Sequence, residues 1–135
     1  MATPAISAQE EQRLMEAAAA AMQRAYAPYS KFHVGAAVLA ESGRVYTGCN
    51  VENASYGLTI CAERNAIFAA VAAEGEGLRL RAIAVTNAAG VPCSPCGACR
   101  QVIFEFGPQA LVIFQGQKGM TRATASELLP AGFTL

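Results

Sequence analysis

The sequence predicts an α/β fold of three layers, in which helices cover both faces of a mixed sheet of about five strands. Three observations predict this architecture. Segments with apolar residues at helical spacing alternate with short apolar and β-branched runs, turn-forming residues separate these segments, and their order along the chain is α-β-β-α-β-α-β-β-α. That order is typical of helices packed on both faces of a mixed sheet.

The first elements are predicted to be a helix and a hairpin. Residues 7–10 have the form of a capping box, and apolar residues then recur at helical spacing until the helix ends before Pro28. Residues 34–39 and 44–47 are predicted strands, because apolar and β-branched residues flank a glycine-bearing turn at 41–43.

The middle of the chain is predicted to hold a loop, a helix, a strand and a second helix. Residues 49–58 lack periodicity and are rich in Asn, Ser and Gly, which predicts an irregular loop leading into a helix from about 61 to 73. Residues 78–86 suit a largely buried strand. A loop with glycine and proline at 87–95 then precedes a helix from 96 to about 106.

The last predicted elements are two short strands and one short helix, at residues 111–114, 121–124 and 125–129. Pro130 stops this helix because proline lacks the backbone N–H and clashes with the preceding turn. A chain of 135 residues is long enough for one compact core and too short for two ordinary domains. We therefore expect a single domain over residues 1–135.

Composition and charge exclude several classes of protein. No apolar run approaches the roughly 20 residues that span a bilayer, and the first 20 residues carry several charges, so we expect a soluble protein with no membrane partner. Ten basic and ten acidic residues leave no net charge, which favours a small substrate over nucleic acid. The chain has no Asp and one His, so it cannot assemble a Ser-His-Asp triad. The 53% of hydrophobic residues leaves apolar surface for a subunit interface.

The five cysteines are interpreted as reduced thiols. They are odd in number, and three of them lie within residues 93–99, which is too cramped for a regular disulfide framework. Reduced thiols are typical of the cytoplasm, so we expect a cytoplasmic location.

Cys61, Cys96 and Cys99 are predicted zinc ligands, with Glu63 close beside the first of them. Thiolates are favoured where a helix begins, because free backbone N–H groups and the helix dipole lower the pKa of a thiol there. Three protein ligands leave one position for water, which is typical of a catalytic zinc. Glu63 is placed to take a proton from that water and redeliver it. This spacing of Cys-x-Glu and Pro-Cys-x-x-Cys is that of zinc deaminases acting on cytosine or adenine.

Cys93 leaves a second interpretation open. Cys93-x-x-Cys96 is also an acceptable ligand spacing, and it would complete a structural site of four cysteines. We favour the three-cysteine set, because Glu63 would be an unfavourable neighbour for a purely structural shell. Cys93 and Cys49 are then interpreted as small, half-buried apolar residues.

Arg64 is a candidate donor to the ligand sulfurs. Three thiolates and one Zn²⁺ sum to one negative charge, which weakens the Lewis acidity of the metal unless nearby donors withdraw charge. Arg64 adjoins Glu63 at the start of the predicted helix. The ordinary alternative is an arginine on the helix surface.

Several further segments resemble the cytidine deaminase family, in its small homotetrameric type with three cysteine ligands. They cover nearly the whole chain: residues 25–32 (AYAPYSKF), 34–37 (VGAA), 48–54 (GCNVENA), 61–64 (CAER), 95–102 (PCGACRQV) and 127–130 (ELLP). The resemblance implies one Zn²⁺ per subunit and proton transfer by Glu63 during attack on C4 of the cytosine ring. It implies deamination of free cytidine and deoxycytidine to uridine and deoxyuridine, with release of ammonia, in pyrimidine salvage.

The resemblance also implies a set of substrate contacts. Asn50 and Glu52 correspond to residues that hold the ribose hydroxyls, and Phe32 corresponds to an aromatic residue that packs on the base. The Ala62 N–H would meet O2 of the pyrimidine, and the Ser94 carbonyl would meet the amino group. Without the resemblance, Asn50 and Glu52 would be interpreted as loop caps and Phe32 as a core residue.

In the family, a neighbouring subunit completes each active site. The aromatic residues that reach across correspond to Tyr56 and Phe133. The resemblance therefore implies a homotetramer whose subunits share residues of each site.

Three other functions are weighed against this one. A blasticidin-S-type deaminase of nucleoside analogues shares the metal motifs, but the segment from Asn50 to Asn53 has the acidic residue expected for an ordinary ribose. A polynucleotide deaminase is disfavoured by the zero net charge and the lack of a basic or aromatic insertion. A non-catalytic zinc-binding module would use Cys93 as a fourth ligand.

Overall fold

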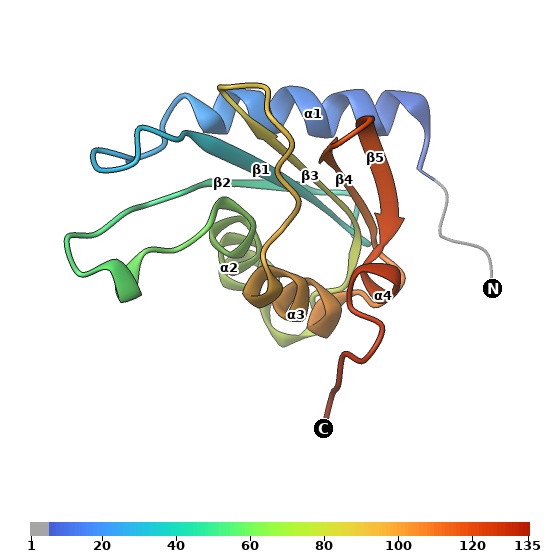
Figure 1. Cartoon of the computed structure of the whole chain (residues 1–135). Coiled ribbons are helices and arrows are strands. Elements are labelled where there is room, and N and C mark those ends of the chain that lie inside the picture. Colours follow the sequence, from blue (N-terminus) through green and yellow to red (C-terminus); the bar gives the residue numbers. More distant parts are fainter. Residues whose placement is uncertain (1–5) are drawn as a thin grey trace.

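The computed structural model describes residues 6–135 and confirms the predicted order of elements (Figure 1). The first five residues of the predicted domain lie outside the described residues. Within residues 6–135, two turns of 3₁₀ helix, η1 and η2, accompany four α-helices and five strands. In chain order these are α1 (Ala8–Met22), β1 (Val34–Ala40), β2 (Val45–Cys49), η1 (Tyr56–Leu58), α2 (Ala62–Glu74), η2 (Gly75–Gly77), β3 (Leu80–Asn87), α3 (Gly97–Phe106), β4 (Leu111–Gly116), β5 (Gly119–Thr124) and α4 (Ala125–Leu128).

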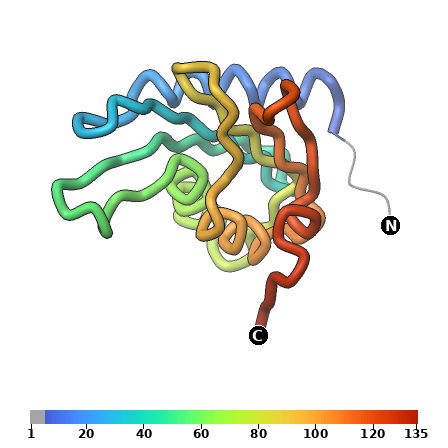
Figure 2. The backbone as a smooth tube through the Cα atoms, in the orientation of Figure 1, coloured from blue at the N-terminus to red at the C-terminus, as the bar shows by residue number. Residues whose placement is uncertain are grey.

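The five strands form one mixed sheet in the order β2-β1-β3-β4-β5. Figure 2 shows the backbone path in the same orientation as Figure 1. β1 pairs antiparallel with both β2 and β3, β3 pairs parallel with β4, and β4 pairs antiparallel with β5. β2, β3 and β4 therefore run in the same direction. The mixed sheet predicted from the sequence is confirmed.

Helices cover both faces of this sheet (Figure 1). α2 connects β2 to β3 and α3 connects β3 to β4, so both crossovers step the same way across the sheet. Right-handed crossovers that step the same way place their helices on the same face. α1 lies on the opposite face. No helix within residues 6–135 is long and apolar enough to cross a membrane.

The two faces of the sheet have separate cores because the side chains of a strand alternate between its faces. On the α1 face, Leu14 and Ala18 pack with Ala37, Leu39 and Ile113. On the other face, a larger cluster joins β1, β3 and β4 to α2 and α3, and its members include Val38, Ala66, Ile67, Ile83, Ile103 and Val112. β1 is buried along its whole length because both faces are covered.

The first helix ends at Met22, earlier than Pro28 alone requires. Its predicted start is confirmed, since the Ser7 side chain accepts from the Glu10 N–H and the Glu10 side chain accepts from the Ser7 N–H. Beyond Met22 the chain turns to pair with a distant segment, and the Tyr26 N–H donates to the Asn50 carbonyl at 3.0 Å. Tertiary hydrogen bonds therefore end this helix before the proline does.

We expect Gly35→Ala to destabilise the fold by about 1–3 kcal/mol or more, as overpacking does in tight cores. A Cβ at Gly35 would lie 2.0 Å from the Ala18 carbonyl oxygen and 2.5 Å from the Met22 backbone nitrogen, so α1 would have to shift. Urea unfolding measures the change in the free energy of unfolding.

Gly77→Ala is the matched control for this substitution. A Cβ at Gly77 meets nothing within 4 Å, so the free energy of unfolding should change by about 0.5 kcal/mol at most. Equal stability of the two variants would contradict the close approach of α1 to β1.

Candidate metal centre and adjoining cavity

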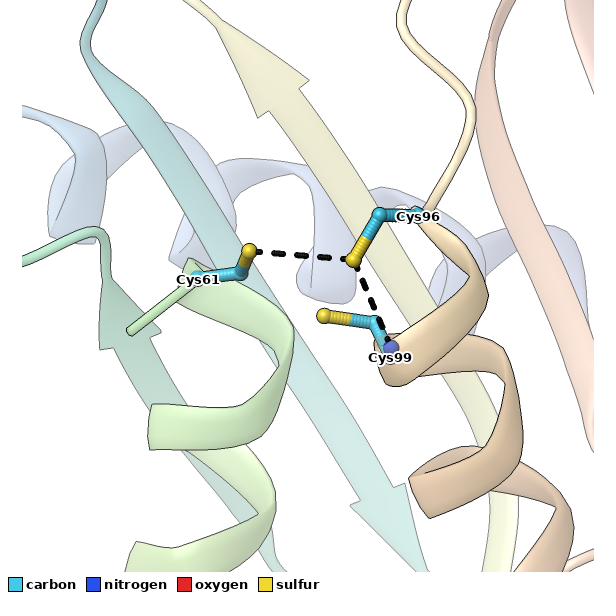
Figure 3. A group of neighbouring side chains, drawn as sticks. All are labelled: Cys61, Cys96 and Cys99. Carbon is cyan, nitrogen blue, oxygen red and sulfur yellow. Dashed lines mark hydrogen bonds between the residues drawn. The ribbon is translucent and has the colours of Figure 1, made fainter. Parts of the chain in front are cut away.

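Two helix N-termini meet at one end of the sheet and bring three cysteines together (Figure 3). Cys61 is the N-cap of α2, Cys96 is the N-cap of α3, and Cys99 lies in the first turn of α3. Both helices begin at the carboxyl ends of strands that run the same way, which is why their N-termini are neighbours. The three Sγ atoms lie within 4.8 Å of one another, and the side chains point toward one another in Figure 3.

The three sulfurs fit a zinc ion. Cys61 Sγ and Cys96 Sγ are 3.9 Å apart, and in a tetrahedral site with Zn–S bonds of about 2.3 Å the ligand sulfurs lie about 3.8 Å apart. All five cysteines are free thiols. Among residues 6–135, the group of side chains able to hold a metal contains these three, and Cys93 lies outside it. This arrangement favours three protein ligands over the four-cysteine alternative.

The cysteine cluster stabilises negative charge on sulfur. The pKa of Cys61 is lowered to about 5, because hydrogen bonds from the Cys99 thiol and the Arg64 guanidinium outweigh the opposing effect of burial. The same pairing with Cys61, reinforced by burial, raises the pKa of Cys99. Cys96 Sγ accepts from the Cys99 backbone N–H at 3.5 Å. A metal ion would therefore meet one thiolate, at Cys61, and would displace the proton of Cys99 when it binds.

The structure places Arg64 against the ligand sulfurs, where the sequence predicts a donor. Arg64 Nη2 donates to Cys61 Sγ at 3.5 Å, and this hydrogen bond raises the pKa of the guanidinium above its usual range. Within the described part of the chain, Arg64 Nε is buried without a hydrogen-bond partner. The Arg64 side chain therefore contacts the cysteine cluster and is not an ordinary surface arginine.

Glu63 is a buried carboxyl group beside the cluster. It is 5% exposed, and burial raises its pKa to about 7, although its own backbone N–H partly opposes the shift. The negative charge of Cys61 raises this pKa further. A carboxyl group with a pKa near neutral pH is suited to both take up and release a proton.

A cavity of about 180 Å³ adjoins the cluster. Several predicted site residues line it: Phe32, Asn50, Cys61, Ala62, Glu63, Ser94 and Cys96. The other lining residues are Val34, Thr59 and Cys93. The cavity is smaller than the roughly 300–1,000 Å³ of typical ligand pockets, so a single chain encloses only part of a ligand of that size.

Asn50 is buried and holds the segment from Phe32 to the start of β1. Its Oδ1 accepts from the Val34 N–H at 2.9 Å, and its Nδ2 donates to the Phe32 carbonyl at 2.8 Å. Nδ2 has a second N–H, which leaves one donor for a ligand in the cavity.

Glu52 does not line the cavity. Its side chain anchors the turn that contains Tyr29 and Ser30. Its Oε1 accepts from the Tyr29 N–H at 3.0 Å and the Ser30 N–H at 3.2 Å, and its Oε2 accepts from the Ser30 hydroxyl. The Ser30 hydrogen bonds lower the pKa of Glu52, which is therefore ionised at neutral pH. A carboxylate has about four acceptor positions, so Glu52 keeps capacity for one more donor.

Tyr56 and Phe133 are exposed and do not line the cavity. Their exposed fractions are 77% and 66%. The Tyr56 ring meets the Tyr29 ring edge-on, with centroids 6.1 Å apart. The Phe133 carbonyl accepts from the Gln101 side chain at 3.0 Å. Within one chain, neither ring reaches the cavity that the cluster adjoins.

Sequence reasoning did not identify three of the cavity residues as site residues. Val34 follows Phe32 by two positions, so the alternation of a strand could have placed both on one face. From the sequence, Cys93 is interpreted as an apolar residue, or as a fourth metal ligand. Burial in the cavity wall raises the pKa of its thiol. Thr59 lies in a segment without periodicity, and no sequence signal placed it at the site.

Comparison with known proteins supports one family. Residues 8–115 match the sequence profile of the cytidine and deoxycytidylate deaminase zinc-binding region. The cytidine deaminase of Halalkalibacterium halodurans is 48% identical over 128 residues, covering 93% of this chain and 95% of that protein. The one from Sporosarcina psychrophila is 45% identical over 126 residues, covering 91% and 90%.

Two crystal structures show the same fold. The cytidine deaminase of Mycobacterium tuberculosis superposes with a TM-score of 0.82 at 42% identity, covering 93% of this chain and 98% of that chain. The one from Burkholderia pseudomallei superposes with a TM-score of 0.81 at 50% identity, covering 90% and 98%. The zinc-binding profile matches residues 8–115, three cysteines are assembled into one cluster within that region, and the relatives from Halalkalibacterium halodurans and Sporosarcina psychrophila are 45–48% identical over most of the chain; this chain belongs to the cytidine deaminase family.

Proposed function

We propose that this protein catalyses the hydrolytic deamination of free cytidine and deoxycytidine to the uracil nucleosides and ammonia. The observation that carries the proposal is the buried Glu63, with a pKa of about 7, in the cavity that Cys61 and Cys96 of the three-cysteine cluster also line. Zinc deaminases combine a zinc site that contains cysteine ligands with a glutamate that acts as general acid and base, and this site offers residues for both.

In this mechanism Glu63 moves the protons. Zinc, when held by the three cysteines, supplies Lewis acidity that lowers the pKa of water toward neutrality. Glu63 takes a proton as oxygen is added at C4 and returns it to the departing amine, so water and the amino group become the ring carbonyl and ammonia. Arg64 donates to Cys61 and withdraws charge from the thiolates, which preserves the Lewis acidity of the metal.

The cavity is proposed to hold the pyrimidine, with Phe32 against the ring. The Ala62 N–H and the Ser94 carbonyl would then recognise O2 and the amino group from opposite sides of the ring. Asn50 has one amide N–H left for a ribose oxygen, and Glu52 has one acceptor position left for a ribose hydroxyl. Because the cavity is small, the ribose would extend beyond the part enclosed by one chain.

A second copy of the chain is proposed to complete each site, in a homotetramer. Tyr56 and Phe133 are exposed aromatic residues, and Leu58 beside Tyr56 is 64% exposed. Exposed apolar groups of this size favour burial at an interface. Sedimentation equilibrium should give the mass of four chains, and a monomer at micromolar concentration would contradict this arrangement.

The decisive experiment follows ultraviolet absorbance of the purified protein with cytidine, deoxycytidine, CMP and blasticidin S. Zinc content is measured on the same sample. Rapid conversion of the two nucleosides, with little conversion of CMP or blasticidin S, is the expected result.

Each other outcome of this experiment identifies a different function. Preferred conversion of blasticidin S would replace the proposal with a deaminase of nucleoside analogues. A sample with one zinc per chain that converts none of the four compounds would instead indicate a non-catalytic zinc-binding module.

We also propose a cytoplasmic location. The five free thiols support it, since the ligand thiols must stay reduced to bind zinc. A disulfide among these cysteines in protein isolated without reductant would contradict it.

A further inference from the structure

Arg100 makes contacts that neither the zinc ligands nor the proposed substrate contacts explain. It follows Cys99 on α3 and is half-buried. Its Nε donates to the Pro95 carbonyl at 2.8 Å, its Nη2 donates to the Ser94 hydroxyl at 3.1 Å, and its Nη1 donates to the Leu128 carbonyl at 3.0 Å. One guanidinium therefore joins the segment before Cys96 to the last residue of α4.

The contact with Pro95 determines the direction in which the chain enters Cys96. A peptide unit is planar, so holding the Pro95 carbonyl fixes the plane of the whole Pro95–Cys96 peptide. The Pro95 ring is fully buried, which prevents the segment from sliding past α3. Cys96 then begins α3 with its Sγ 3.9 Å from Cys61 Sγ. Arg100 thus acts on the position of one ligand sulfur through the backbone.

The contact with Ser94 holds one wall of the cavity. Ser94 and Cys93 line the cavity, and the Cys93 N–H donates to the Gln115 carbonyl at 2.9 Å. The segment from Cys93 to Pro95 is therefore held by hydrogen bonds to β4 at Cys93 and to Arg100 at Ser94 and Pro95. Without Arg100, the hydrogen bond from Cys93 to β4 and the burial of Pro95 would remain, but the hydrogen bonds at Ser94 and Pro95 would be lost.

We propose that Arg100 is a positioning residue that holds the Ser94–Pro95 wall and the Cys96 sulfur in reactive geometry by tying both to the end of α4. This inference rests on the proposed deaminase function. It differs from the role of Arg64, which donates to a sulfur directly, because the three acceptors of Arg100 are oxygens. The action of Arg100 is geometric.

Lysine cannot replace this arrangement. A guanidinium presents five N–H donors in a rigid planar fork, whereas an ammonium is a single point of charge on a flexible stem. Arg100→Lys keeps the charge and removes the simultaneous contact with three oxygens. A role through charge would therefore survive in this variant, and a role through geometry would not.

The test compares Arg100→Lys with the wild-type protein in three measurements. For Arg100→Lys we expect kcat for cytidine to fall about 10- to 100-fold with a smaller change in KM, as for other groups that orient metal ligands. We expect zinc release to a chelator to accelerate by a similar factor. The visible absorption of the Co²⁺-loaded protein should shift, since it reports the ligand geometry.

Arg122→Lys is the matched control. Arg122 pairs with Glu11 between β5 and α1, on the face of the sheet away from the cluster. This variant should match the wild-type protein in kcat, zinc release and the Co²⁺ spectrum. If Arg100→Lys does not fold, Ser94→Ala removes one of the three contacts and should shift the same measurements by a smaller factor.

Two results would overturn the inference. If Arg100→Lys has the same kcat, zinc release and Co²⁺ spectrum as the wild-type protein, the Arg100 hydrogen bonds do not position the site. A lower melting temperature with unchanged kcat and spectrum would show that the contacts only stabilise the fold. If the wild-type protein deaminates nothing, the proposed function fails, and zinc release and the Co²⁺ spectrum still decide whether Arg100 positions Cys96.

Discussion

Glu63→Gln should lose kcat by about 10²- to 10⁴-fold, the range that general acid–base catalysis supplies, while keeping one zinc per chain. Glutamine has nearly the size of glutamate, so the buried position stays filled, but an amide cannot take up and return a proton. The carboxyl group is 5% exposed and its pKa is raised to about 7, mainly by burial. Steady-state kinetics with cytidine and metal analysis of the same sample measure the two parts of this prediction.

The matched control is Glu105→Gln, on the exposed side of α3. It removes an exposed carboxylate that does not line the cavity and should leave kcat within experimental error. Near-normal turnover by a zinc-loaded Glu63→Gln protein would contradict the proposed proton transfer by Glu63. Loss of zinc in this variant would show instead that Glu63 supports metal binding.

Cys96→Ala should lose zinc, activity and stability together. It removes one of three ligand sulfurs and the acceptor of the Cys99 N–H at the start of α3. Metal binding is linked to folding, and a metal at about 100 times its Kd stabilises the native state by about 2.7 kcal/mol. We therefore expect the variant to melt at a lower temperature and to show no response to a chelator. The wild-type protein should fall toward this temperature when its zinc is removed.

Cys93→Ala separates the three-cysteine site from the four-cysteine alternative. Cys93 lines the same cavity but lies outside the cluster of ligand sulfurs. This variant should therefore keep its zinc. A zinc-free Cys93→Ala protein, or a zinc-loaded Cys96→Ala protein, would mean that the ligands are assigned wrongly.

Local sequence signals predicted the elements well because they act within a few residues. The capping box at residues 7–10 is formed by two hydrogen bonds three residues apart, and the strands around 41–43 pair as the predicted hairpin. The motifs at 61–64 and 95–102 likewise identified the cysteines that the fold brings together. Short-range hydrogen bonds and repeating apolar positions are written directly in the order of residues.

The end of the first helix shows where local signals are insufficient. Its periodicity continues beyond Met22, but the Tyr26 N–H is taken by the Asn50 carbonyl and the Glu52 N–H by the Tyr26 carbonyl. A pairing between segments so far apart depends on where the sheet places them. No window of neighbouring residues contains that information.

By itself, the sequence determined the order of elements, the three cysteines of the cluster and the acid beside them, because each is a property of residue type and short spacing. Only the tertiary structure decided that Cys61 meets Cys96, that Glu63 is buried, and that Thr59 and Cys93 share the cavity. These features depend on β2 and β3 running the same way and on two crossovers placing α2 and α3 on one face. Distances between side chains, and the loss of water that raises a pKa, exist only after those elements have packed.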